Sequence, residues 1–424
     1  MKVTRDNLVK IEDDPLELFY QGFKSDITRI SYTNKLRKIL CDYLEDVLEG
    51  SFENRASQMV YKAKENPQEA LRILLSLSKM LRERTEKDSS DKEYLNPSSF
   101  NNFFKPIKKM LDMNGVSVVW KRIYATYPEQ NNLGDTRGYM RQEIHDMLQF
   151  CNAIDKAIIL AAASSGARVG GLGGLKWEDV MPVYRIDDRL TLDITESEVS
   201  RSEIVCAILM VYRHTRDEYP AFITPEAYNA ILNYRTSWIS EIGKEPKPNE
   251  PLFKKVGPFV RQLHGDGIRK RVERIIEKSG LINILFKSRR HNVPAMNGFR
   301  RFFNKVNKET LSKDSPLAAL IKKEFQMGHI GLVQLDRNYF KTHIMELIEE
   351  YLNAVPNLTI SNEEREKVEN MKLRKRTSEL EEKIAEIEDL KRRMRIMEKT
   401  RSKEDADKIE ELERRIMMLE KTDS

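Results

Sequence analysis

Helical periodicity dominates the first part of the chain and limits what that part can fold into. Apolar residues recur at intervals of three and four between Leu36 and Leu81, so each helical segment gains one apolar face. The polar stretch 86–96 interrupts this pattern and predicts a loop. We therefore expect a helical bundle over residues 1–127, followed by a short polar linker at 128–135.

The middle of the chain mixes helical patterns with one interval rich in strand-forming residues. Strands are predicted at 180–184, 190–194, 204–212 and 221–223. Thr224 and Pro225 then provide a capping hydroxyl and a proline suited to the first turn of a helix. Residues 136–357 are thus expected to form an α+β domain that is mainly α-helical with a small antiparallel β-sheet.

The C-terminal part is highly charged and carries a regular apolar stripe. Leu373, Leu380, Ile387 and Met394 repeat every seven residues. This spacing predicts a coiled-coil or antiparallel helical pair over 361–422, which we expect to mediate self-association. A lone solvated helix or a partly disordered tail remains the alternative.

Composition excludes several classes of protein without identifying one. Cys41, Cys151 and Cys206 lie far apart, and the six histidines show no paired-ligand spacing, so we expect neither disulfides nor a metal site. The apolar run 157–163 is too short to span a bilayer, and the first residues lack an apolar signal core, which predicts a cytoplasmic protein without membrane contact. The net charge of +6 is too small to indicate a polyanionic partner by itself.

Glycines at 170–174 need comparison with phosphate-binding loops. Such a loop requires a following Gly-Lys-Ser/Thr, or a preceding strand with GxGxxG at the start of a helix. Neither pattern occurs here, so no nucleotide or other cofactor is expected. We expect these glycines to allow close backbone packing around Arg168.

Four residues have the chemistry for a metal-free phosphodiester exchange. Arg168 follows an apolar helix and a Ser-Ser-Gly-Ala turn, and Arg300 precedes an apolar helical start. His329 follows a glycine, and Tyr339 comes ten residues later. Guanidinium groups can bind phosphate oxygens with two parallel hydrogen bonds, a tyrosine hydroxyl can form a covalent intermediate, and a histidine can donate a proton or hydrogen bond.

In this order, the segments RGYMRQEIHDMLQF, SSGARVGGLGGLKWEDV, NGFRRFF and MGHIGL, followed by Tyr339, resemble the tyrosine recombinases (site-specific integrases), most closely their archaeal branch. The resemblance implies an enzyme that breaks and rejoins double-stranded DNA through a 3′-phosphotyrosyl bond to Tyr339. It implies that Arg168 and Arg300 clamp the non-bridging phosphate oxygens and that His329 is a further donor to them. It also implies a homo-tetramer on DNA and a DNA-clamping role for residues 1–127.

The sequence departs from the family pattern at three positions. The family usually carries a lysine on a β-hairpin, and His214 stands there, with Arg213 and Arg216 as rivals for the role of general acid. The family usually has histidine three residues before the second arginine, where this chain has Asn297. The acidic residue often found three positions after the first arginine is replaced by Gly171.

These departures leave two alternative functions open. One is a recombinase-like DNA-binding protein with weak or absent catalysis, and the other is a strand-passing activity similar to type IB topoisomerases. For all three functions, the basic clusters 269–274, 287–290 and 300–308 are the candidate DNA-facing segments, because phosphate contacts dominate affinity for DNA.

Overall fold

The computed structural model describes residues 14–88, 90–129, 136–187, 189–281, 286–287, 290–291, 293–313, 315–329, 344–400 and 413–415. Contacts divide the chain into two compact units, Met1–Asp135 with Lys287–Arg290, and Thr136–Phe286 with His291–Ser424. Each unit has its own hydrophobic core. Most of the linker expected at 128–135 falls outside the described residues, and the limits 1–127, 136–357 and 361–422 stay predictions.

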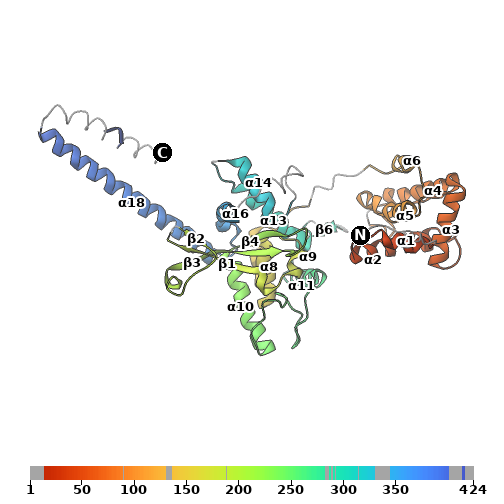
Figure 1. Ribbon diagram of the computed structural model, residues 1–424, viewed down its shortest axis with the longest axis horizontal. Helices are drawn as coiled ribbons and strands as arrows, with labels where there is room; N and C mark the ends of the chain where they lie inside the picture. The colour runs from red at the N-terminus through yellow and green to blue at the C-terminus, as the bar shows by residue number, and fades with distance from the viewer. Residues whose placement is uncertain are drawn as a thin grey trace, which may run out of the picture. The chain divides into compact units, whose positions relative to one another are not determined.

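The described residues of the first unit fold into helices, in agreement with their periodicity (Figure 1). Asn66 caps α4 by accepting the N–H of Glu69, and Pro67 is the first helical residue. Leu74, Leu77 and Leu81 of α4 are buried in the core of the unit. The helices are α1 (Pro15–Gln21), α2 (Asp26–Arg37), the π-helix η2 (Lys38–Tyr43), α3 (Phe52–Glu65), α4 (Pro67–Glu86), the 3₁₀ turn η3 (Pro97–Ser99), α5 (Asn101–Met113) and α6 (Trp120–Tyr124).

The second unit contains the small antiparallel sheet that the sequence predicts. Its four strands lie in the order β2-β1-β3-β4. Tyr212 follows β3, and the register pairs Val211 with Tyr219 at the hairpin end of the sheet. The strands are β1 (Val180–Ile186), β2 (Arg189–Thr191), β3 (Ser202–Val211) and β4 (Tyr219–Ile223).

One strand is shorter than predicted. The sequence extends the second strand to residue 194, but β2 ends at Thr191. The Thr191 hydroxyl accepts the backbone N–H of Asp193 and donates to the carbonyl of Asp193. This local side-chain turn replaces the hydrogen bonds that a longer ladder would need, which is why the strand stops.

Helices surround the sheet and hold the segments that carry the candidate residues. These helices are α7 (Arg141–Leu148), α8 (Ala153–Ser165), α9 (Val169–Gly174), the 3₁₀ turn η4 (Trp177–Asp179), α10 (Pro225–Ile242), α11 (Gly265–Lys278), α13 (Ala295–Glu309), α14 (Pro316–Gln326), α16 (Ile344–Leu352) and α17 (Val355–Leu358). A separate two-stranded sheet consists of β5 (Phe286–Lys287) and β6 (Arg290–His291). The helix α8 is apolar on nearly every face and contacts α10, α13 and β4 (Figure 1). Tyr351 of α16 is fully buried, and its hydroxyl donates to the Ser164 carbonyl at the end of α8 at 2.9 Å. The predicted cap of α10 is confirmed, since the Thr224 hydroxyl accepts the N–H of Ala227.

The charged tail begins with one long helix, α18 (Asn362–Thr400) (Figure 1). Two residues of its apolar stripe are exposed, Leu373 by 57% and Ile384 by 55%. Arg415, from the end of the tail, forms an ion pair with Glu386 of α18 at 3.4 Å. The helix agrees with the sequence, while the coiled coil stays a prediction. Among the helices described, none is long and apolar enough to cross a membrane.

Candidate active site

The two predicted arginines are brought together by a close approach between α8 and α13. Gly166 ends α8 in the left-handed conformation, with φ of 60°. A Cβ atom built on Gly166 would lie 2.5 Å from the ring of Phe303 in α13, so only glycine fits between these helices. Arg168 follows two residues later, and Arg300 occupies the first half of α13. The sequence separates these arginines by more than a hundred residues, and this packing makes them neighbours.

Arg300 is held in place before any ligand arrives. Its Nη1 donates to the carbonyl of Gly166 at 2.5 Å, and its Nη2 donates to the carbonyl of Met327 at 2.9 Å. Nη2 also lies 2.8 Å from Nε2 of His329. A guanidinium has five N–H donors, so the Nε–H and one Nη1–H are not used by these three contacts and can turn to a phosphate, although the Tyr219 hydroxyl lies close enough to compete for one of them. Arg300 is therefore a preorganised half of an anion site.

Arg168 is the exposed counterpart of this fixed group. It lies at the start of α9 with an exposed side chain. Burial lowers the pKa of Arg300, and the positive charge of Arg168 lowers it further. Two guanidinium groups this close repel one another unless an anion lies between them. The pair is thus a site that a phosphodiester would stabilise.

His329 is oriented by a carboxylate that the sequence did not single out. Its Nδ1 contacts the Glu324 carboxylate, and Lys308 binds the same carboxylate at 3.1 Å. Burial raises the pKa of Glu324, but hydrogen bonds from His329 and Lys308 outweigh burial and lower it overall. A carboxylate on Nδ1 fixes the proton there, which makes Nε2 the acceptor for Arg300. In this arrangement His329 supports Arg300 instead of offering a donor to phosphate.

Tyr219, the first residue of β4, lies beside this group and was also missed from the sequence. Its side chain is 7% exposed, and its ring packs on Gly328, where an added Cβ would lie 2.4 Å from a ring carbon. Gly328 has a φ of 63°, so the close contact and the backbone both require glycine. A strand-edge tyrosine looks like an ordinary core aromatic in sequence, and only the fold places it next to the residues that bind Arg300.

Asn297 and Gly171, the two departures from the family pattern near the arginines, supply no charge to the site. Asn297 is exposed on α13, one helical turn before Arg300. A Cβ on Gly171 would lie 2.5 Å from a side-chain carbon of Val211, so a carboxylate side chain does not fit there without movement of β3. The packing therefore explains why this position carries no acidic residue.

The hairpin turn holds the rival general acids in different settings. His214 is exposed with a φ of 62°, and its backbone N–H donates to Glu218 at 2.6 Å. Arg213 binds the carbonyl of Glu178 and the buried carboxylate of Asp179. Arg216 is 86% exposed at its side chain. The choice among them stays open, although Arg213 is already committed to a structural ion pair.

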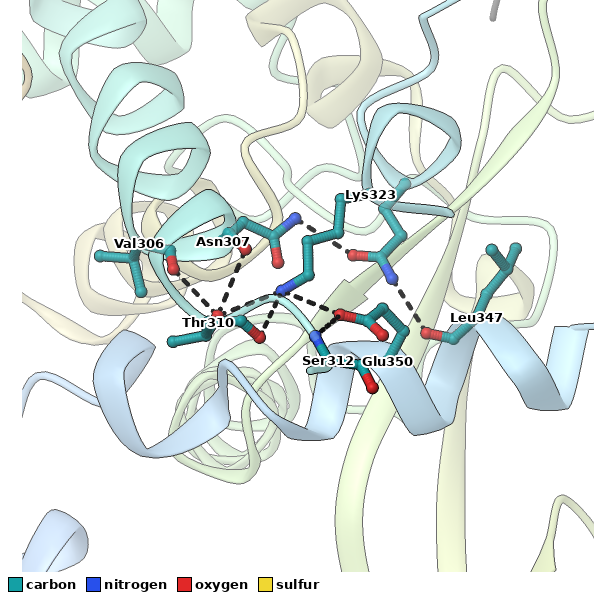
Figure 2. A network of polar contacts seen from close by, with 8 residues as sticks. Val306, Asn307, Thr310, Ser312, Lys323, Leu347 and Glu350 are labelled. Carbon is teal, nitrogen blue, oxygen red and sulfur yellow. Dashed lines mark hydrogen bonds and ion pairs between the residues drawn. The ribbon is translucent and has the colours of Figure 1, made fainter. Parts of the chain in front are cut away.

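Tyr339 lies outside the described residues, as do the neighbouring residues 330–343. The elements on both sides of that segment are joined by a buried polar network (Figure 2). Lys323 of α14 donates to the carbonyl and hydroxyl of Thr310, each at 3.1 Å, and lies 3.4 Å from the Glu350 carboxylate of α16. Gln326 accepts from Asn307 of α13 and donates to the Leu347 carbonyl of α16. This network fixes α16 against the helices that carry Arg300 and Glu324.

No metal centre is found in the described part of the chain, where no three histidine, cysteine or acidic side chains cluster. The three cysteines are free, and burial raises the pKa of the Cys151 thiol to about 12. Close packing requires glycine at two of the positions near Arg168, Gly171 and Gly173: a Cβ on Gly173 would lie 2.7 Å from the backbone nitrogen of Gly265 in α11, whereas a Cβ on Gly174 would meet nothing within 4 Å.

The basic clusters are partly neutralised by local ion pairs. In the first cluster, Arg269 binds Asp266 and Glu273, and Arg271 binds Asp155. The side chains of the second cluster, 287–290, lie outside the described residues. The third cluster contains Arg300 itself. A DNA-facing role for these segments stays a prediction.

Comparison with known proteins adds a set of structural relatives. No protein-family model matches the chain, and a search of curated proteins gives no match. The chain is similar to the crystal structure of XerA recombinase, with 14% identity over 80% of this chain and 97% of that chain and a TM-score of 0.32. The neighbours are recombinases and an integrase.

Two further similar structures are complexes with DNA sites. XerH site-specific recombinase bound to palindromic difH substrate, a post-cleavage complex, shares 14% identity over 81% of this chain and 98% of that chain, with a TM-score of 0.42. A lambda integrase dimer bound to a COC′ core site shares 15% identity over 80% of this chain and 92% of that chain, with a TM-score of 0.37. Recombinases and integrases are the family that the sequence motifs resemble.

Proposed function

We propose that this chain is a site-specific DNA recombinase that breaks and rejoins double-stranded DNA through a covalent bond to Tyr339. One observation carries the proposal: Arg168, Arg300 and His329 come from three distant segments and converge on one site. Arg300 is anchored there by backbone carbonyls of two separate segments. Paired guanidinium groups with free donors suit a phosphodiester, whose charge spreads over its non-bridging oxygens in the transition state.

The proposed reaction needs no nucleotide. The Tyr339 hydroxyl loses its proton as its oxygen attacks the phosphorus, and the bond from phosphorus to the 5′-oxygen breaks; the leaving 5′-oxygen takes up a proton, so a 3′-phosphotyrosyl bond and a 5′-hydroxyl form with no net change in protons. Arg300 offers its Nε–H and one Nη1–H to the non-bridging oxygens, and Arg168 closes from the other side. A 5′-hydroxyl from a second duplex then reverses the step, because the phosphotyrosyl bond retains the energy of the original linkage. Four copies on two duplexes would complete the exchange.

The test begins with a duplex selected from a random-sequence pool by binding to the wild-type chain. The selected duplex is then synthesised with a nick at each successive position, so that a cut beside a nick releases a short strand and traps the covalent adduct. We expect an adduct that survives denaturation and is lost in Tyr339→Phe, with duplex binding unchanged. A Tyr351→Phe control should still form the adduct, because the Tyr351 hydroxyl is bonded within the core. An adduct that persists in Tyr339→Phe would refute the assignment.

A second candidate is a DNA-binding protein with weak or no catalysis. It is favoured by the neutral Asn297, by Gly171, where packing excludes a carboxylate, and by Arg213, which is bound to Asp179 at the hairpin. Tight binding of the selected duplex without an adduct on any nicked version, between pH 6 and pH 9, would decide for this candidate.

A further inference from the structure

The buried hydroxyl of Tyr219 lacks a partner in the candidate site. Within the described residues its oxygen makes no hydrogen bond of normal geometry, and its hydroxyl proton has no acceptor, although the Arg300 guanidinium lies close enough to interact with the oxygen both as a charge and as a hydrogen-bond donor. Buried hydroxyl groups nearly always have a hydrogen-bond partner, so an unsatisfied one requires an explanation. A ligand that enters the site would supply the missing acceptor.

The Tyr219 ring has a defined position relative to Arg300. The ring packs on Gly328, between Met327 and His329. The guanidinium of Arg300 binds both of these flanking residues, through the Met327 carbonyl and the His329 imidazole. Tyr219 therefore lies against the segment that fixes Arg300.

A second tyrosine extends this wall toward Arg168. Tyr212 follows β3 across the hairpin, and its ring centroid lies 6.3 Å from that of Tyr219. The Tyr212 hydroxyl lies 3.4 Å from the position of a Cβ on Gly170, two residues after Arg168. Arg300 and Arg168 both lie close enough to Tyr219 to interact with it through their charge.

We propose that the Tyr219 hydroxyl donates a hydrogen bond to a non-bridging oxygen of the phosphate bound by Arg168 and Arg300. This role rests on the proposed function. It adds a neutral hydrogen-bond donor to the two cationic donors, Arg168 and Arg300. Burial raises the pKa of Tyr219, and the nearby arginines oppose that effect without reversing it. The hydroxyl therefore keeps its proton at neutral pH and can act as a donor.

The experiment compares Tyr219→Phe with the wild-type chain on the nicked, selected duplex. Phenylalanine keeps the ring on Gly328 and removes only the oxygen. We expect the rate of adduct formation to fall about 100-fold, the lower end of the range for loss of one donor to a transition-state oxyanion. The thermal unfolding midpoint should stay the same or rise, because an unsatisfied buried group is removed. Tyr228→Phe, which removes a half-buried tyrosine hydroxyl from α10, should leave the rate unchanged.

A chemically altered substrate locates the hydrogen bond. In a methylphosphonate duplex, one non-bridging oxygen of the scissile phosphate is replaced by a methyl group. For the stereoisomer that lacks the oxygen facing Tyr219, we expect wild-type and Tyr219→Phe chains to react at equal rates. Equal slowing of Tyr219→Phe on the normal duplex and on both stereoisomers would show that the tyrosine acts only through packing.

The remaining outcomes separate the two proposals. A normal rate for Tyr219→Phe on the unmodified duplex overturns the hydrogen bond and leaves the proposed function intact. Complete loss of the adduct in Tyr219→Phe, with the phosphotyrosyl peptide of the wild-type chain mapping to Tyr219, would make this residue the nucleophile instead. A wild-type chain that forms no adduct overturns the proposed function and the role of Tyr219 together.

Discussion

The buried pair Lys323 and Glu350 offers a test of how the helices around the site are held. Their side chains are 1% and 5% exposed, and the ammonium and carboxylate lie 3.4 Å apart. Lys323→Met removes the cation and its two hydrogen bonds to Thr310. The Glu350 carboxylate then keeps the hydrogen bond from the Ser312 N–H. Removing one partner of a buried ion pair costs about 3–5 kcal/mol, so we expect a loss of that size in the free energy of unfolding.

The matched variant Glu350→Gln should lower the free energy of unfolding by less than Lys323→Met does. Its amide oxygen can still accept from Ser312, and burial already lowers the pKa of Lys323, so the lysine can lose its proton when the carboxylate is gone. The double variant Lys323→Met/Glu350→Gln retains neither of the two charges of this buried pair. We therefore expect it to be more stable than Lys323→Met alone by about 1–3 kcal/mol, since the unpaired carboxylate accounts for most of the loss.

Urea unfolding followed by tryptophan fluorescence measures these differences in the second unit alone. The chain has three tryptophans, and Trp120 belongs to the core of the first unit. With Trp120→Phe in every variant, the signal comes from Trp177 and Trp238 of the second unit. If the losses of the two single variants simply add in the double variant, to within about 0.5 kcal/mol, the electrostatic reasoning is wrong.

Three further predictions follow from single positions. Asn297→His should cleave the selected duplex as fast as the wild-type chain or faster, measured by adduct formation, and a large loss would show that the position does not face the phosphate. Gly328→Ala should lower the free energy of unfolding by about 1–3 kcal/mol, because it places a Cβ at a positive φ and against the Tyr219 ring; an unchanged urea midpoint would contradict this. Burial raises the pKa of Glu143, but its hydrogen bond with Arg137 contributes to an overall lowering, so its contribution to stability is present above about pH 4.5 and lost as the pH falls through the lower folded value. Glu143→Gln should therefore flatten the acid side of the stability profile, and a slope identical to that of the wild-type chain would exclude this ion pair as its source.

Local patterns predicted the elements well because each depends on neighbouring residues. The hairpin at 204–223 and the helix after Thr224 follow from alternation and from a capping hydroxyl, and the structure has both. The end of β2 at Thr191 was missed because a side-chain turn competes with the ladder. Such a turn leaves no trace in hydrophobic patterning.

The candidate site was only partly predictable. Arg168, Arg300 and His329 stand in recognisable motifs, and the structure brings them together. Glu324 and Tyr219 stand in no recognisable motif, and their roles could not be predicted because they depend on which segments meet after folding. Glu324 lies five residues before His329 on the last turns of α14, where an acidic residue usually marks an exposed face. The carbonyls of Gly166 and Met327 cannot be predicted from residue type at all, since every residue has one.

The fold holds Arg300 by hydrogen bonds but leaves the side chain of Arg168 exposed, and this difference has a consequence for which arginine is retained. Arg300 loses its conformational freedom during folding, whereas exposed Arg168 still has up to about 2 kcal/mol of rotamer entropy to lose when it meets a phosphate. A variant of this chain without the proposed activity would still need Arg300 to join its segments, whereas in the part of the chain that the structure describes no hydrogen bond or ion pair holds the Arg168 side chain. If the proposed function is right, the exposed arginine is thus the position that reports most directly on whether the activity is kept.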